Sequence, residues 1–499
     1  MKKDISLYLS CIALSIYFLL FAGILTSVIF NNVIFQYRVS ICLIMLAVLA
    51  LFLAVFLFVY NKFASDIIKH RYKLLAIISI FIFAIQMVIS CNMEQNFMYD
   101  HDKTFNAAVV WVTQGNSEDF QLYSNYLHHT PHQMGIFLVQ QLLFKISTVF
   151  GFTNYFMVAC IAGHILFMIM NVTAFKYLDE FISSHAAVFY LLIAIIYVPL
   201  YFQSSISYTD SWTAWAAPCT LLYVTRAVNA ASKKGMVING IMAGVLTGVA
   251  IQIKSTTVFV LIAMIINIIV KGVKKNHLQA MAVVMCCLLI TGSCFEKWNY
   301  ATVLEEYRDG EAMPITNWIM MGLQGDGSYS GYDEWEITCS VPPDERMDLN
   351  IKVIKERLSE MGPSGYIKLL YKKTCRSFGS GNADLRYSFK YEEDSNPSTL
   401  LYHMVFENGR FYGIINNLSH GVYLMMNLLG ITGAAIILFK YRKEAYNFVP
   451  YVALIGFWIF MMLWESNHRQ LINQWSLYFI TAATGLYYIW RLWKDRKSI

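Results

Sequence analysis

The chain has 499 residues, of which 57% are hydrophobic and 14% are charged, and its mean hydropathy is +0.49. About a quarter of the residues of a soluble protein are charged, so this composition excludes a soluble globular fold and indicates an all-α protein that crosses the membrane many times. The formal net charge is +6. Because Lys and Arg fall in short stretches between apolar runs, where they set orientation, we expect the lipid bilayer as a partner and no nucleic acid.

Apolar stretches of about 18 residues predict membrane-spanning helices. About twelve occur by this criterion, at 5–30, 40–60, 74–90, 155–175, 186–203, 212–228, 237–253, 255–270, 278–295, 413–438, 448–463 and 471–489. The N-terminus, the loop after the second stretch and the C-terminus are basic, which predicts a cytoplasmic location for all three. The expected parts are two additional N-terminal spans (1–73), a transmembrane core (74–295), a large external loop (296–412) and the C-terminal spans (413–499).

The first external loop, residues 91–153, is expected to contain interfacial helices and the catalytic groups. Its segment 133–150 is apolar but includes two Gln and one Lys, so it either crosses the membrane or lies flat on the outer surface. Only the flat arrangement brings Asp210 to the face that carries Asp100 and keeps the downstream basic loops in the cytoplasm. We therefore expect the flat arrangement.

The large external loop is the one long polar segment, and an ordered segment of this length is usually functional. Residues 348–361 within it predict an amphipathic helix. Cys339 and Cys375 also lie in this loop, and the sequence leaves open whether they form a disulfide.

Charged side chains beside expected spans are candidates for chemistry, because charges near lipid are expensive unless they react, bind or pair. The topology gathers such groups on the external face: Asp100 with Asp102, Asp210, Lys254, and the turn that contains Glu465, His468 and Arg469. A carboxylate can deprotonate or orient an acceptor hydroxyl. Cations can stabilise a departing phosphate, where negative charge develops. The set is therefore typical of sugar transfer from a lipid phosphate.

Each candidate also has a structural interpretation. The two acids of the first loop could be solvated loop charges, and Asp210 could cap the next helix. Lys254 could extend its ammonium group to the membrane interface. Arg469 could form an ion pair with Glu465, one helical turn away.

Three histidines of the first loop, His128, His129 and His132, are candidate metal ligands. They lack a second ligand motif, so the signal is weak. The sequence implies no certain cofactor and leaves a divalent metal ion open.

Four stretches resemble motifs of the GT-C superfamily of polyprenyl-phosphate-sugar glycosyltransferases, in particular Gram-positive multi-pass proteins similar to protein O-mannosyltransferases and aminoarabinose transferases. They are the Asp before Asn-Ala-Ala in 100–108, the Tyr…Pro-x-Gln-x-Gly pattern in 126–135, Tyr-Thr-Asp at 208–210, and Glu-x-x-x-Arg at 465–470. The sequence departs from the family pattern where His101 separates the two acids and where Gln470 replaces the usual Tyr.

The resemblance implies an inverting transferase that moves a sugar from an undecaprenyl-phosphate-type donor to an extracytoplasmic glycan, lipid or protein. Asp100 would act as base, with the other acids, Asp102 and Asp210, assisting. Lys254, His468 and Arg469 would bind the lipid phosphate. The alternatives are a polysaccharide polymerase or ligase, which would depend on Arg and His of the large loop, and a transporter of lipid-linked oligosaccharides, which would show internal repeats.

Overall fold

The structure is a computed structural model that describes residues 2–497 except 31, 33, 94–96, 98, 303–311, 384, 390–398 and 447. Helices joined by turns and loops make up the described part, which contains no β-strand. The all-α expectation is therefore confirmed. The excepted stretches 303–311 and 390–398 belong to the segment expected as the large external loop, so this part of that prediction lies outside the described residues.

Seven helices in the described part are long and apolar enough to cross a membrane. They are α1 (Lys2–Phe30), α2 (Val39–Lys69), α3 (Arg71–Cys91), α7 (Tyr155–Phe181), α12 (Lys233–Ile253), α14 (Lys275–Thr302) and α20 (Tyr412–Phe439). Shorter apolar helices are α8 (Ser184–Ile196), α13 (Val258–Lys271) and α21 (Val449–Leu463). The other expected positions hold α11 (Ala216–Val228) and α22 (Trp475–Lys497). The count of twelve spans and their orientation stay predictions.

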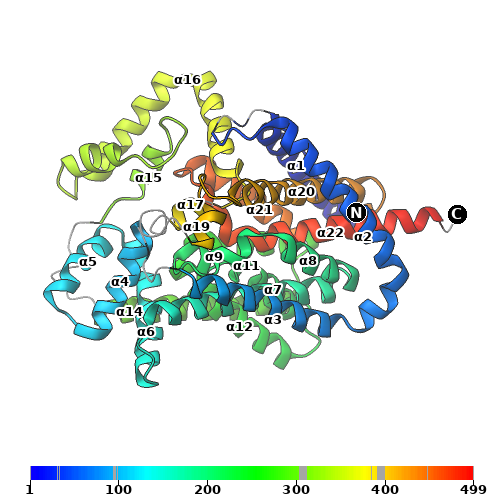
Figure 1. Ribbon diagram of the computed structural model, residues 1–499, viewed down its shortest axis with the longest axis horizontal. Helices are drawn as coiled ribbons and strands as arrows, with labels where there is room; N and C mark the ends of the chain where they lie inside the picture. Colours follow the sequence, from blue (N-terminus) through cyan, green and yellow to red (C-terminus); the bar gives the residue numbers. More distant parts are fainter. Residues whose placement is uncertain are drawn as a thin grey trace.

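Two helix groups make the body of the molecule (Figure 1). In one, α20 packs against α22 and α1, and in the other α12 packs against α14 and α11. The α20–α22 crossing needs glycine, because a Cβ on Gly485 would lie 1.9 Å from the carbonyl oxygen of Leu429. Small residues let helix backbones approach in this way where lipid offers no hydrophobic drive for association. The N-terminal helix α1 is thus part of the C-terminal group.

The first loop folds into a separate helical group at one side of the molecule (Figure 1). It contains α4 (Tyr99–Gln114), α5 (Glu118–His129), η1 (Pro131–Gln133) and α6 (Met134–Val149). Helix α4 packs against α5 and α6, and α6 also packs against α7 and α12. Helices are therefore present where interfacial helices were expected, and whether α6 crosses the membrane stays open.

The segment before α20 contains α15 (Thr316–Met321), η4 (Tyr332–Ile337), η5 (Thr338–Ser340), α16 (Arg346–Phe378), α17 (Leu385–Ser388) and α19 (Leu400–Val405). Helix α16 includes the expected helix 348–361 and continues beyond it after a kink, visible at the top of Figure 1. The kink lies at Gly362, whose φ of +58° favours glycine and which precedes Pro363. Cys339 and Cys375 do not form a disulfide.

Candidate active site

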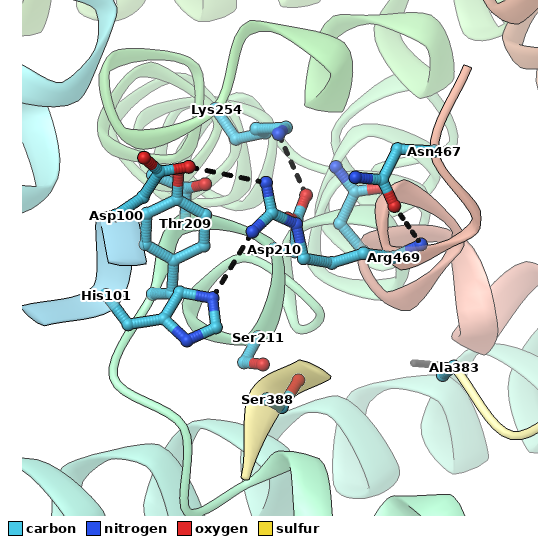
Figure 2. A network of polar contacts seen from close by, with 12 residues as sticks. Asp100, His101, Thr209, Asp210, Ser211, Lys254, Ala383, Ser388, Asn467 and Arg469 are labelled. Atoms are coloured by element: carbon cyan, nitrogen blue, oxygen red, sulfur yellow. Dashed lines mark hydrogen bonds and ion pairs between the residues drawn. The ribbon is translucent and has the colours of Figure 1, made fainter. Parts of the chain in front are cut away.

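Four charged side chains from distant parts of the chain form one network. Nε of Arg469 lies 3.4 Å from Oδ2 of Asp210, and its Nη2 lies 3.7 Å from Oδ2 of Asp100. The other Asp210 oxygen lies 2.8 Å from Nζ of Lys254. Figure 2 shows the guanidinium of Arg469 between the two acids, with Lys254 above Asp210 in this view. The two carboxylates and the two cations balance each other, as buried charges require.

Local structure explains how each group reaches the network. Asp100 is in the first turn of α4, where the helix N-terminus favours negative charge. Asp210 is in the short helix α10 (Thr209–Trp212), and Lys254 follows the end of α12 in an extended conformation. The N-cap residue of η7 (His468–Gln474) is Asn467, whose side chain accepts a 3.0 Å hydrogen bond from the backbone N–H of Arg469.

A close backbone contact places Lys254 beside the first-loop helices. A Cβ on Gly135 of α6 would lie 1.9 Å from the carbonyl oxygen of Gln252, two residues before Lys254. No side chain fits at that position. The Gly of the Pro-x-Gln-x-Gly pattern is therefore required where α6 crosses the end of α12.

Exposure differs across the network and indicates its accessible side. Only 1% of the Asp210 side chain is exposed, compared with 13% for Arg469, 20% for Lys254 and 38% for Asp100. The most buried acid lies between the two cations, and the most exposed acid lies at the edge. Asp100 is thus the carboxylate that a substrate can reach.

The surroundings of Asp100 keep it ionised. Burial raises the pKa of its carboxyl, but the charges of Arg469 and His101 and the hydrogen bonds from Tyr126 and Tyr208 outweigh burial. The pKa is therefore below its ordinary value. The Tyr208 hydroxyl lies 3.3 Å from Oδ2 of Asp100 and accepts a 2.7 Å hydrogen bond from Gln133. An ionised carboxylate held in this way is suited to orient a hydroxyl by accepting its hydrogen bond.

Aromatic rings enclose the guanidinium of Arg469. It lies 4.9 Å from the ring centre of Tyr208 and 5.3 Å from that of Tyr387, and its Nη1 lies 3.4 Å from Nε2 of His101. Such stacking suits Arg and fixes the plane of its donors. Tyr387 also stacks on Tyr99, beside Asp100. Sequence reasoning missed Tyr387, because a single Tyr in a polar segment carries no local signal.

Three of the predicted site residues lie outside the charged network. Asp102 accepts a 2.6 Å hydrogen bond from Asn106, one turn further along α4. His468 is buried, and its ring meets that of Phe35 edge to face at 4.9 Å. Glu465 is half-buried and is not paired with Arg469.

The alternative interpretation of Arg469 as the ion-pair partner of Glu465 is therefore not supported, for a conformational reason. The expectation required a helix, which brings side chains four residues apart onto one face. The described chain from 465 to 467 is instead irregular, and Asn467 is extended. Burial raises the pKa of Glu465 to about 7, although the charge of Arg469 opposes this rise. Asp210 likewise does not occupy the N-cap of α10, a position held by Tyr208.

A fully buried lysine, which sequence reasoning also missed, supports the turn before Arg469. Nζ of Lys373 in α16 donates to the carbonyl oxygens of Gly322 at 2.9 Å and Trp464 at 2.7 Å. The N–H of Ser466 donates to Gly327 in the same segment. Helix α16 therefore holds the segment around Gly322 against the chain that leads into Arg469.

The loop between α1 and α2 contacts the turn that contains His468 and Arg469. Phe35 meets His468, the neighbour of Arg469, and Asn32 donates a 2.8 Å hydrogen bond to the carbonyl oxygen of Gly379. The chain after Gly379 contacts the site as well, since the ring centre of Tyr387 lies 5.3 Å from the guanidinium of Arg469. The loop between α1 and α2 and the chain after Gly379 thus both contact the turn that contains His468 and Arg469.

The first-loop histidines do not converge on a common point. Nε2 of His129 lies 3.0 Å from Oε1 of Glu334, and the ring of His132 meets that of Trp318 edge to face. No three His, Cys, Asp or Glu side chains in the described ranges are placed to hold a metal ion. The described residues thus do not fit the suggested metal site, and no step below depends on a metal.

The chain is similar to three solved structures at low identity. One is the archaeal oligosaccharyltransferase AglB from Archaeoglobus fulgidus in complex with an inhibitory peptide and a dolichol-phosphate, with 11% identity, a TM-score of 0.44, and coverage of 86% of this chain and 52% of AglB. The chain therefore spans about half the length of AglB. The others are ArnT from Cupriavidus metallidurans in the apo state (10% identity, TM-score 0.35, coverage 85% and 78%) and bound to undecaprenyl phosphate (13%, 0.31, 83% and 77%).

All three TM-scores are below 0.5, so the function is proposed from the side chains and sequence motifs alone. No curated protein sequence matches the chain. One family model, described as conserved hypothetical integral membrane protein, matches residues 4–487. Since this match covers nearly the whole sequence, the chain belongs to that family of integral membrane proteins.

Proposed function

We propose that the protein is a membrane glycosyltransferase that moves a sugar from a polyprenyl-phosphate donor to an extracytoplasmic acceptor. The observation that carries the proposal is the network in which Arg469 contacts both Asp100 and Asp210 while Asp210 also contacts Lys254. It combines an accessible carboxylate with two adjacent cations, which are the groups that transfer from a lipid phosphate needs. The sequence motifs around these residues resemble the GT-C pattern and add support.

In the proposed reaction, the acceptor hydroxyl oxygen attacks the anomeric carbon of the sugar, and the bond from that carbon to the phosphate oxygen breaks. Polyprenyl phosphate leaves with the bonding electron pair, and attack from the opposite side inverts the anomeric centre. Asp100 accepts the hydrogen bond of the attacking hydroxyl and takes its proton as the new bond forms. A hydroxyl proton is far more acidic in that transition state than in the free acceptor, so an ionised carboxylate suffices.

The two cations act on the leaving phosphate. The planar guanidinium of Arg469 can make paired hydrogen bonds to phosphate oxygens, and Lys254 supplies a second positive charge. Asp210 keeps both cations in place before the donor binds, so little reorganisation is needed when negative charge develops. The proposal places this site on the extracytoplasmic face, with both chain termini in the cytoplasm.

Transfer assays on membranes test the proposal. Membranes that contain the wild-type chain or Asp100→Asn are supplied with radiolabelled polyprenyl-phosphate sugars from the host, and label in the acceptor fraction is counted. The expected result is loss of about a hundredfold or more of transfer in Asp100→Asn. Asp119→Asn, an exposed acid on the neighbouring helix α5, is the matched control and should transfer normally. Wild-type transfer by Asp100→Asn would reject the assignment.

The same assay distinguishes the polymerase alternative. That function would depend on Arg or His in the segment before α20, where Arg376 lies 4.0 Å from Asp326. Glycosyl transfer by the proposed site predicts a far larger loss for Asp100→Asn than for Arg376→Ala. The reverse order would favour a polymerase or ligase.

A further inference from the structure

Three large aromatic side chains lie exposed on one short turn of the segment before α16. Exposed fractions are 55% for Tyr329, 68% for Tyr332 and 55% for Trp335, and we call these three residues the aromatic ledge. Contiguous exposed apolar groups, unlike single ones, mark interaction surfaces or ligand-binding grooves. Tyr and Trp are also the residues that most often dominate binding energy.

The backbone under the aromatic ledge is firmly held. Buried Asp333 accepts two hydrogen bonds from Arg357 of α16, at 2.7 and 2.8 Å, and Arg357 also donates to the carbonyl oxygen of Met320 at 2.8 Å. A further buried contact joins Thr338 to Asn350 at 2.9 Å. Rings on a fixed backbone lose little entropy when a ligand binds. Tyr332 and Trp335 belong to the π-helix η4, a form that occurs frequently at functional sites, and Tyr329 precedes it.

The aromatic ledge is continuous with the candidate active site. Trp335 stacks on His129 of α5, with ring centres 4.8 Å apart, and Glu334 pairs with the same histidine. One turn earlier on α5, Tyr126 donates a hydrogen bond to Asp100. Helix α5 therefore links the ledge to the proposed base within a single helical turn.

The chemistry of the aromatic ledge favours a neutral, hydroxyl-rich ligand. The exposed Glu336 and the half-buried Glu334 place carboxylates among the rings. Negative charge disfavours contact with an anionic lipid surface, whose protein partners are rich in Lys and Arg. A sugar ring has a flat C–H face that stacks on aromatic rings, and hydroxyl groups that donate to carboxylates. A saccharide matches both features of the ledge.

We propose that Tyr329, Tyr332 and Trp335 bind the saccharide acceptor and lead its terminal hydroxyl toward Asp100. The role of this saccharide as the acceptor rests on the proposed transferase function, whereas saccharide binding by the aromatic ledge does not. The inference narrows the acceptor class from glycan, lipid or protein to a chain of sugar residues.

Binding of neutral oligosaccharides to the full chain in detergent micelles tests the proposal. The probes are size-fractionated neutral oligosaccharides released from the surface polymers of the host, and binding is measured by titration calorimetry. Trp335→Ala and Tyr332→Ala should each weaken binding about tenfold or more. Phe152→Ala, an aromatic residue that is 65% exposed elsewhere, should bind as wild type does. In transfer assays the ledge variants should raise KM for the acceptor more than they lower kcat.

Asp100→Asn separates this proposal from the transferase function, because it should keep most of the oligosaccharide binding that the aromatic ledge supplies, while its transfer falls about a hundredfold or more. Absence of oligosaccharide binding to the wild-type chain, or equal binding by a Tyr332→Ala/Trp335→Ala double variant, would overturn the ledge proposal alone. A third result would also overturn the ledge proposal: Trp335→Ala binds the oligosaccharides as wild type does, but loses thermal stability in vesicles that contain anionic lipid. That result would assign the aromatic ledge to the membrane surface.

Discussion

The carboxylate of Asp210 lies 2.8 Å from Nζ of Lys254, and only 1% of its side chain is exposed. The same acid contacts Arg469, so one buried charge holds two cations in place. Asp210→Asn should therefore destabilise the protein by about 3–5 kcal/mol, because it removes the acid that pairs with Lys254 and leaves Arg469 with Asp100 alone. Unfolding in detergent micelles measures the change, and unaltered stability would contradict the pairing.

Arg469→Lys should weaken the phosphate contact, although it retains the charge. A lysine ammonium group cannot stack between Tyr208 and Tyr387 or make paired hydrogen bonds. Binding of undecaprenyl phosphate, followed by titration in micelles, should fall about tenfold, or about 1.4 kcal/mol. Arg376→Lys is the matched control, since the Arg376 guanidinium lies 4.0 Å from the partly exposed Asp326. Equal effects of the two substitutions would argue against a phosphate site at Arg469.

Asp102→Asn should leave transfer close to wild type. Asp102 accepts a hydrogen bond from Asn106 in its own helix and takes no part in the charged network. The lost contact should change stability by about 1 kcal/mol or less. If Asp102→Asn lost most of its transfer activity while its unfolding free energy stayed close to that of wild type, Asp102 would have a role in the active site.

Glu465→Gln should change how stability depends on pH. Burial raises the pKa of Glu465 in the folded state from 4.5 to about 7. As pH rises through this window, the unfolded state loses its proton first, so the wild-type protein loses stability, by up to roughly 3 kcal/mol. Gln cannot ionise, so the variant does not lose this stability. Its free energy of unfolding should therefore rise relative to that of wild type as pH increases from 4.5 to 8. Glu118→Gln, at an exposed position, should show no such gain. Parallel pH profiles of Glu465→Gln and wild type would refute the raised pKa.

Gly135→Ala should disturb the site although Gly135 carries no chemistry. The new methyl group would lie 1.9 Å from the carbonyl oxygen of Gln252, so α6 or the end of α12 must shift, and Lys254 with it. We expect a loss of about 1–3 kcal/mol in stability and reduced transfer. Gly23→Ala has open space around it and should be neutral or slightly stabilising. Comparable unfolding of the two variants would show that the close contact has no effect.

Much of the fold and part of the site follow from the sequence, for separable reasons. Apolar runs predict helices because lipid leaves the backbone no other hydrogen-bond partners, and α1 and α20 begin and end near the expected positions. Helix α2 begins where expected but continues to Lys69, beyond the expected end at residue 60. Asp100 and Arg469 were identifiable because isolated charges beside apolar runs demand an explanation. Their 3.7 Å contact agrees with the expected convergence, while their catalytic roles stay predictions.

Other parts of the site depend on contacts between distant segments, which leave no local pattern. The sequence around Tyr387 does not show that its ring covers Arg469, and nothing near Lys373 indicates that its ammonium group is buried against Trp464. Helical spacing suggested an ion pair of Glu465 with Arg469 as an alternative, and this pair does not form because the backbone there is not helical. Short irregular turns are thus where sequence spacing misleads most.

The contacts that Asn32 and Phe35 make with Gly379 and His468 have a consequence for dissecting this protein. A shortened chain that starts at α3 would retain every charged residue of the network. The turn that contains His468 and Arg469 would nevertheless lose its contact with Phe35. Deletion of the first two helices should therefore abolish the proposed sugar transfer, and co-expression of the missing residues 1–70 as a separate polypeptide should restore it at least in part.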